Sequence, residues 1–336
     1  AARTLAAALN CADPIAPCGE CSSCDRCARG AHPAYWEFAP VGATHRVADV
    51  RDQWLPIAFR TAVDAAWKVL RIIDADRLNE SAANAFLKGL EEPPARTVWI
   101  LEMADPDELP DTILSRCRLV RFSAWGPSEL DAEAARLKLE PGEDRDLAVR
   151  ACLGSPGALE RLAAPGGIDA LREHRAIIGR LRAQGPGYAL AAAKLIDDEA
   201  KRRAAAIKAE GRAELAELAE LYSDQAPRAV VKQAEERQAR REREARTAVA
   251  QAALDDLVAW CRDCLMVAAG GDPADAINAD AAQALAADAR ALGQARLLQT
   301  VDLLLGVRED LELNVQQTLA LEAMFLQISA LALPPH

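Results

Sequence analysis

The sequence predicts an α/β core built on a parallel sheet, followed by a second region made only of helices. Two apolar runs, "WKVLRIIDAD" (67–76) and "RTVWILEM" (96–103), are typical of buried parallel strands. Between them, "ESAANAFLKGLEEPP" (80–94) has a helical pattern that Pro93-Pro94 ends. Strand, helix and strand in this order form the repeating unit of a parallel sheet.

Shorter signals complete the α/β part. "AARTLAAALNC" (1–11) opens in helical register, so we expect further residues to precede Ala1 in the natural protein. Gly30 and Pro33 mark a turn that leads into a short strand. "RLVRF" (118–122) is expected to be the last strand of the sheet.

Past this point the strand patterns stop and helices take over. The first helices are short, with breaks at Pro141, at Gly154-Ser155-Pro156-Gly157 and at Pro165-Gly166-Gly167. Long helices are expected from about residue 188 onward. A chain of 336 residues has room for two or three domains. We predict three: an α/β domain at 1–123, a small helical domain at 124–186 and a larger helical domain at 187–336.

Composition narrows the class of protein. The chain has no apolar run long enough to span a bilayer and no signal peptide, so we expect a soluble, intracellular protein. Its net charge of −11 argues against a protein whose main task is to grip the nucleic-acid backbone. A weakly basic helix at 228–246 could still touch DNA, although its Glu/Arg pairs favour a solvated helix.

Five of the nine cysteines are bunched at metal-ligand spacing, in "CGECSSCDRC" (18–27) and at Cys11. In a reducing compartment this pattern favours a metal over disulfides. Cys18 and Cys21 form a Cys-x2-Cys knuckle that supplies two thiolates. Cys24, with either Cys11 or Cys27, would complete a tetrahedral zinc site. Four sulfur ligands leave no open position for water, so such a site is structural.

Two alternatives to zinc remain at this point: an iron–sulfur cluster and thiols without a metal. The bacterial ferredoxin run has three residues before its fourth cysteine and a proline after it. Here Asp25 and Arg26 are the only residues before Cys27, and Ala28 follows it. The spacing therefore favours zinc. Cys261 and Cys264, one helical turn apart with no second pair nearby, are expected to be buried thiols.

Two further positions could carry chemistry. Asp74 ends an apolar strand, as in a Walker B pattern, where the aspartate holds Mg²⁺ on a nucleotide and a following glutamate activates water. Here the next residue is Ala75, which cannot activate water. Arg116, in "LSRC" (114–117), ends a short helix and could present its guanidinium to the phosphates of a neighbouring molecule.

Taken together, "LNC", "CGECSSC…GAHP", "DADRLNESAANAFLKGLEEPP" and "SRC" resemble the δ′ subunits of the bacterial DNA polymerase III clamp loader. The resemblance covers roughly residues 1–122. It implies a core of the AAA+ type whose P-loop precedes Ala1 and is missing from this chain, a helical lid at 124–186 and a helical collar at 187–336.

The resemblance also assigns residues. It implies that the zinc ligands are Cys11, Cys18, Cys21 and Cys24, within a module at 11–33 that leaves Cys27 spare. Arg116 resembles the finger that such subunits place against the ATP of the adjacent subunit, and Ser115 would orient that turn.

Departures from the related γ/τ subunits imply that this chain does not hydrolyse ATP. A γ/τ subunit has Asp-Glu where this chain has Asp74-Ala75, and a lid arginine in a Gly-Ser-x-Arg turn where this chain has Gly154-Ser155-Pro156-Gly157. We therefore expect a non-hydrolysing stator that supplies Arg116 in trans, with no ATPase or polymerase activity of its own. Asp74 would be a degenerate Walker B residue.

The resemblance further implies γ/τ and δ subunits as partners in a hetero-oligomer. It implies contact with the sliding clamp β and primed DNA through the complex, no membrane, and a cytoplasmic, nucleoid-associated replisome. The alternatives are an active ATPase of the γ/τ type and an unrelated zinc-binding scaffold.

Overall fold

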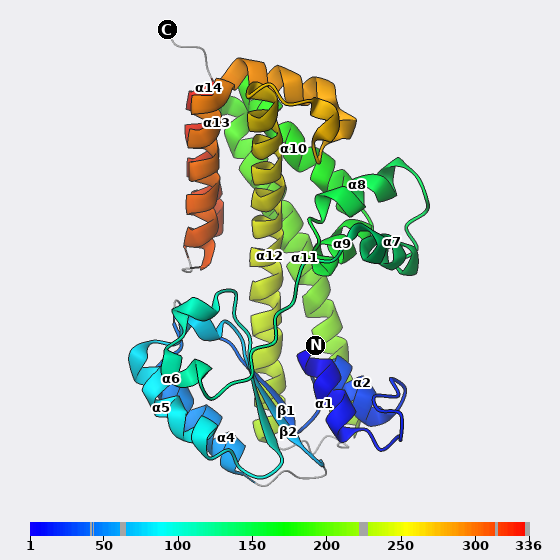
Figure 1. Ribbon diagram of the computed structural model, residues 1–336, viewed down its shortest axis with the longest axis vertical. Coiled ribbons are helices and arrows are strands. Elements are labelled where there is room, and N and C mark those ends of the chain that lie inside the picture. Colours follow the sequence, from blue (N-terminus) through cyan, green and yellow to red (C-terminus); the bar gives the residue numbers. More distant parts are fainter. Residues whose placement is uncertain (41, 43, 61–64, 222–227, 313–314, 333–336) are drawn as a thin grey trace. The chain divides into compact units, whose positions relative to one another are not determined.

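The computed structural model describes residues 1–40, 42, 44–60, 65–221, 228–312 and 315–332 (Figure 1). The chain divides into two compact units, Ala1–Phe122 and Ser123–His336. The first contains every strand among the described residues, and the elements described in the second are all helices. The predicted succession of an α/β core and a helical region is thereby confirmed.

The first unit is built on a parallel three-stranded sheet in the order β1-β2-β3. The strands are β1 (Tyr35–Phe38), β2 (Lys68–Ile72) and β3 (Thr97–Leu101). Their register aligns Phe38 with Ile72 and Ile72 with Leu101, so the carboxyl ends of the strands meet at one edge. The predicted strands at 67–76 and 96–103, and the short strand after Pro33, are confirmed with tighter bounds.

Helices cover both faces of this sheet, as a parallel sheet requires. The helices of the unit are α1 (Ala2–Asn10), α2 (Ser22–Ala28), α3 (Val47–Asp49), α4 (Leu55–Phe59), α5 (Glu80–Glu91) and α6 (Asp111–Leu114). Leu70 and Ile72 of β2 pack with Trp54 and Phe86, whose rings lie edge to face with centroids 5.5 Å apart. Val69, on the other face of the same strand, packs against α1 and α2.

Two stretches of the first unit differ from the sequence prediction. Arg118–Phe122, predicted as a strand, is exposed and forms no strand, because no neighbouring strand among the described residues offers it backbone hydrogen bonds. Residues 47–59, to which the pattern assigned no element, form α3, one turn of π-helix (Val50–Trp54) and α4. This segment becomes helical because Trp54 and Ala58 are buried against α5.

The second unit begins with short helices, and the predicted breaks between them are confirmed. These are α7 (Pro127–Arg136), α8 (Glu143–Ala151), α9 (Pro156–Ala163) and α10 (Gly167–Gln184). Ser155 caps α9, since its Oγ accepts a hydrogen bond of 3.2 Å from the N–H of Ala158. Long helices follow: α11 (Pro186–Leu221), α12 (Arg228–Ala268), α13 (Ala282–Glu312), which is kinked at Gly293, and α14 (Gln317–Ala332).

Helix α10 contributes to both hydrophobic cores of the second unit. Its first turns supply Ile168 and Leu171 to a core shared with α7, α8 and α9. Its last turns supply Ile177, Ile178 and Leu181 to the core of the long helices. The predicted domain boundaries at 123/124 and 186/187 stay a prediction.

Helices α11 and α12 pack side by side as a long hairpin (Figure 1). Gln238 is buried between them and donates from Nε2 to the carbonyl oxygen of Ile207 at 2.7 Å. A Cβ on Gly211 would lie 1.9 Å from the Gln238 side chain, so this glycine permits the close approach. The possible DNA contact at 231–246 stays a prediction, and part of that stretch lies outside the described side chains.

Candidate functional site

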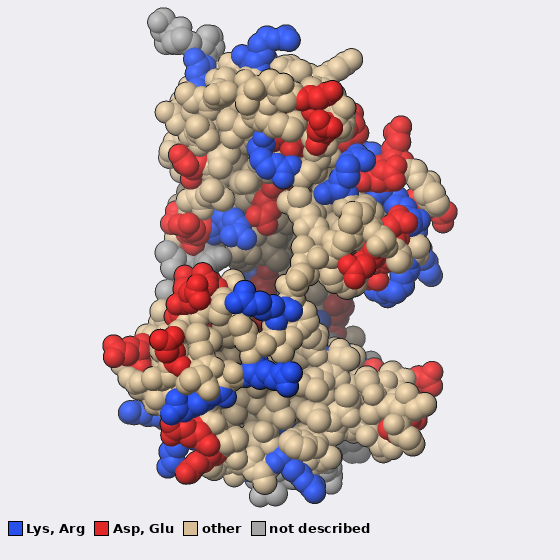
Figure 2. Space-filling model, viewed as in Figure 1, with Lys and Arg blue, Asp and Glu red and all other residues tan. Residues whose placement is uncertain are grey.

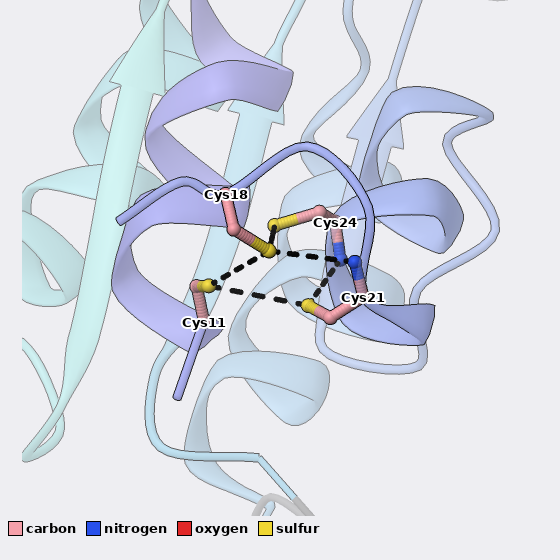
Figure 3. Close-up of side chains that lie close together, drawn as sticks. All are labelled: Cys11, Cys18, Cys21 and Cys24. Atoms are coloured by element: carbon pink, nitrogen blue, oxygen red, sulfur yellow. Dashed lines mark hydrogen bonds between the residues drawn. The ribbon is translucent and has the colours of Figure 1, made fainter. Parts of the chain in front are cut away.

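Four cysteine side chains meet beside the sheet of the first unit (Figure 3). The sulfurs of Cys11, Cys18, Cys21 and Cys24 all lie within 4.8 Å of one another. Sγ of Cys11 is 3.7 Å from that of Cys18 and 3.9 Å from that of Cys21. Cys18 and Cys24 are 3.9 Å apart. These residues could hold a metal ion.

Two helix ends and the loop between them position these sulfurs. Cys11 follows the last residue of α1, and Cys21 is the N-cap of α2, with Cys24 in the first turn of that helix. Backbone N–H groups point at the sulfurs: that of Cys21 donates to Cys18 Sγ, and that of Cys24 donates to Cys21 Sγ, each at 3.4 Å. A Cys-x2-Cys spacing closes a turn of this kind.

The same N–H groups favour thiolates. The pKa of Cys21 is lowered to about 7, first because the backbone N–H of Cys24 donates to its sulfur. The pKa of Cys11 is also lowered, first by a backbone hydrogen bond at Cys18. In contrast, the pKa of Cys24 is raised to about 12: although the backbone at Gly19 lowers it, burial and the neighbouring thiols outweigh that effect.

The donor set fits a soft metal with tetrahedral preference. Thiolates are the ligands of structural zinc, and no imidazole or carboxylate belongs to the cluster among the described residues. A tetrahedral metal held by these four sulfurs would have no open coordination position and therefore no catalytic water.

A chain of hydrogen bonds ties the cysteine module to the sheet. The backbone N–H of Ala34 donates to His32 Nδ1, which leaves Nε2 as the donor to Ser23 Oγ at 3.2 Å. Ser23 in turn donates to the carbonyl of Asn10, whose side chain accepts from the N–H of Trp67. His32 thus has a structural role in this turn.

The remaining cysteines do not join the cluster. Cys27 is fully buried in α2, and burial raises the pKa of its thiol to about 11. Cys261 and Cys264 are buried in α12, in agreement with the prediction of packed thiols. Burial raises the pKa of Cys261 to about 12.

Arg116 follows α6 and is partly exposed, with 36% of its side chain accessible. Its Nη1 donates to the carbonyl oxygen of Thr112 at 2.8 Å and to Ser115 Oγ at 3.3 Å. Its Nη2 lies 2.5 Å from Glu91 Oε1. Ser115 therefore does contact the arginine that the sequence singled out.

Asp74 lies past the end of β2, at the carboxyl edge of the sheet. Its backbone is left-handed, with φ of 50°, and its side chain is half exposed, with Oδ2 4.0 Å from Arg77 Nε. Ala75 is fully buried and donates its N–H to the carbonyl of Glu102. Asp76 accepts from the N–H of Ala104 at 2.9 Å, so it braces the turn after β3.

Glu91 is the site residue that sequence analysis missed. It lies in the last turn of α5, directly before Glu92 and the two prolines. Two carboxylates at the C-terminal end of a helix oppose its dipole, which favours cations there. This misplaced charge is the signal that could have drawn attention to "LEEPP".

Comparisons with known proteins agree with the motifs. Residues 1–125 match the family model described as "DNA polymerase III, delta subunit". The chain is 36% identical over 144 residues to the DNA polymerase III subunit delta' of Escherichia coli K12, which covers 42% of each chain. It is 38% identical over 176 residues to the delta' subunit of Pseudomonas aeruginosa, covering 51% of this chain and 52% of that protein.

A second group of relatives carries the name tau. The chain is 36% identical over 141 residues to the DNA polymerase III subunit tau of Salmonella typhimurium, covering 41% of this chain and 21% of that protein. A crystal structure of a DNA polymerase III gamma subunit-related protein from Thermotoga maritima aligns with 89% of this chain and 84% of its own, at 16% identity and a TM-score of 0.42. The chain spans about half the length of the delta' relatives it matches.

Within the described part of the chain, no helix is long and apolar enough to cross a membrane. The face shown in Figure 2 carries acidic and basic side chains intermingled, with no continuous basic surface.

Proposed function

Because residues 1–125 match the family model described as "DNA polymerase III, delta subunit", we propose that this chain works as a clamp-loader subunit of DNA polymerase III. In this proposal it does not hydrolyse ATP itself. It supplies Arg116 to the ATP bound by a neighbouring γ/τ subunit, and so helps to load the sliding clamp on primed DNA during replication.

The observation that carries the proposal is the placement of Arg116. A partly exposed guanidinium after α6, anchored on the carbonyl of Thr112, can reach a phosphate outside its own chain. Guanidinium groups recognise phosphate through paired N–H donors and stabilise the charge that develops during phosphoryl transfer. Ser115 supports this arrangement by accepting one of the N–H groups.

The residues around Asp74 support the second half of the proposal. Hydrolysis needs a group that positions or activates water next to the metal-binding aspartate. The adjacent Ala75 has no such group and is fully buried. In the predicted lid, Ser155 caps α9 and no arginine occupies the turn Gly154-Ser155-Pro156-Gly157. The chain's own residues therefore offer little to a nucleotide in cis.

The metal of the proposal is structural zinc, held by Cys11, Cys18, Cys21 and Cys24. Zinc would cross-link the end of α1, the loop that follows and the start of α2, and it would supply no chemistry to ATP hydrolysis. Asn10, Ser23 and His32 then link this module to the sheet by hydrogen bonds.

The partners belong to the same proposal. We place the chain in a hetero-oligomer with γ/τ and δ subunits in the cytoplasm, and contact with the β clamp and DNA is made through the complex. Acidic and basic side chains are intermingled on the visible face (Figure 2). This supports a role within the assembly rather than direct binding of DNA by this chain.

The test is Arg116→Ala in the reconstituted loader. The ATP site that faces this subunit should slow by on the order of 10²-fold or more, because an arginine finger is worth at least that much. The total ATPase rate of the loader should fall by the fraction of that rate which this one site contributes. Arg118→Ala, at a neighbouring exposed arginine, is the matched control and should leave the rate unchanged. An unchanged rate in Arg116→Ala would refute the finger assignment.

The second candidate is an active ATPase of the γ/τ type. It is favoured by the tau relatives, whose identity of 36% equals that of the Escherichia coli delta' subunit. The two candidates differ in the ATPase activity that they predict for the isolated protein. Only an active ATPase of the γ/τ type would hydrolyse ATP at a substantial rate without its partners.

A further inference from the structure

We propose that Glu91 is a positioning residue for Arg116: it holds the guanidinium where a neighbour's phosphate can meet it. This inference rests on the proposed role of Arg116. It extends that role to a residue on a different helix, 25 positions earlier in the chain, and makes a separate prediction about the rate.

The contacts of Arg116 show how its side chain is held. Nη1 is bound to the carbonyl of Thr112 at 2.8 Å and to Ser115 Oγ at 3.3 Å, both on its own turn. Nη2 lies 2.5 Å from Oε1 of Glu91, on α5. The guanidinium is therefore clamped between two helices. Within the described part of the chain its Nε–H has no hydrogen-bond partner, so it stays available to a phosphate oxygen.

The end of α5 that carries Glu91 is held in place by packing and by a hydrogen bond. Phe86 of α5 is fully buried in the core of the first unit. Trp99 of β3 donates from Nε1 to the carbonyl of Gly89 at 3.0 Å, which anchors the last turn of α5. A Cβ on Gly89 would lie 2.7 Å from Leu55 Cδ2, so this turn is packed closely against α4. Because Glu91 lies within one turn of these contacts, its backbone has little freedom to move.

Charge gives an independent reason for this pairing. Glu91 and Glu92 lie at the C-terminal end of α5, where the helix dipole disfavours acids. Of the two, Glu91 pairs with Arg116. A carboxylate in an unfavourable position, opposite the one arginine that the motifs single out, is better explained by the orientation of that arginine than by the stability of α5.

Orientation matters because an arginine side chain has much rotational freedom to lose. An exposed ion pair adds little stability, about 0.2–1 kcal/mol. When the guanidinium must reach one place in the transition state, however, a partner that limits its rotamers lowers the entropic cost of reaching it. The expected effect lies in kcat, because the ATP of the neighbour is bound chiefly by the neighbour's own residues.

The experiment compares variants in the reconstituted loader, with ATP as the substrate. Glu91→Ala should lower kcat at the facing site by about three- to fivefold, the size of one lost exposed ion pair. The KM for ATP should not change. Glu91→Asp, which keeps the carboxylate, should restore part of the rate. Glu92→Ala is the matched control at the same helix end and should behave as wild type.

Two outcomes separate this inference from the proposed function. If Arg116→Ala leaves the rate unchanged, the proposed function fails. If Arg116→Ala slows the loader but Glu91→Ala matches wild type, only the positioning role fails. In an Arg116→Ala background, Glu91→Ala should have no further effect. An additional loss there would mean that Glu91 acts on the fold or on another group, and would overturn the inference.

Discussion

At the scale of single residues, the cysteine cluster shows what spacing can and cannot decide. The run "CGECSSCDRC" predicts a knuckle at Cys18 and Cys21 but leaves Cys11 and Cys27 as equal candidates for the fourth ligand. The fold separates them. Cys11 lies at the end of α1 facing the knuckle, whereas Cys27 is in the last turn of the short helix α2 and faces the hydrophobic core.

Metal analysis tests this assignment. The purified wild-type protein should contain zinc at close to one per chain, and Cys11→Ala should lose most of it, because three thiolates and water hold zinc far less tightly. Cys27→Ala removes a buried thiol outside the cluster and should keep the zinc. Iron in the wild type would contradict zinc, and full zinc in Cys11→Ala would contradict the ligand set.

Residues that act through tertiary contacts could not be predicted in the same way. Arg116 stood out because it belongs to a short motif, "SRC". Glu91 pairs with it across 25 residues, and a pairing of that kind exists only once α5 and α6 are packed together. The same holds for Asn10, whose side chain reaches the N–H of Trp67 at the start of β2.

At the scale of elements, α10 is joined to the long helices by buried charge. His174, only 1% exposed, places Nδ1 2.9 Å from Asp256 Oδ2 of α12 and Nε2 3.4 Å from Glu199 Oε2 of α11. Arg161 of α9 binds the same Asp256 at 2.9 Å. Burial alone would lower the pKa of His174, but the two carboxylates outweigh it and raise that pKa.

The raised pKa gives a pH dependence of stability with a definite sign. At a pH below the usual value of about 6.5 the histidine is protonated whether folded or not, so the ion pairs contribute fully. As pH rises through the folded-state pKa, this contribution is lost. We therefore expect wild type to exceed His174→Gln in unfolding free energy by about 1–3 kcal/mol at pH 6, with a smaller difference at higher pH.

Urea unfolding of both proteins from pH 6 to pH 9 measures this difference. His32 and His45 are present in both proteins, so their own titration cancels in the comparison. The pKa values of both are lowered, first by burial, so their effect on stability has the opposite sign. A difference that stays constant would show that folding does not shift the pKa of His174, and one that grows with pH would show that folding lowers it; either would contradict the prediction.

Elements also mark the limit of pattern-based prediction. The buried strands and the breaks between α7 and α10 followed from apolar runs and from glycine and proline. "RLVRF" (118–122) has the apolar content of a short strand, but a strand needs a neighbour to bond with, and the described part of the chain offers none. Residues 47–59 are helical because Trp54 is buried, which local propensity does not reveal.

At the scale of the whole molecule, the proposed role depends on the carboxyl edge of the sheet in the α/β unit. The carboxyl ends of β1, β2 and β3 meet at one edge, where ligands of parallel sheets are usually bound. At that edge Asp74 is followed by the fully buried Ala75, and Asp76 is occupied by the N–H of Ala104. This edge and the partly exposed Arg116 support the proposal that the subunit completes a site on another chain.

The full-length protein on its own should therefore hydrolyse ATP at a rate close to that of a blank, since no residue next to Asp74 can activate water. A DNA polymerase III tau subunit assayed under the same conditions serves as the positive control. Adding the wild-type protein to its partner subunits should raise their ATPase rate, and the Arg116→Ala protein should raise it less. A turnover by the isolated protein that approaches the tau rate would instead establish an active ATPase, and Asp74 would then have to act with a water-activating group outside the sequence motif.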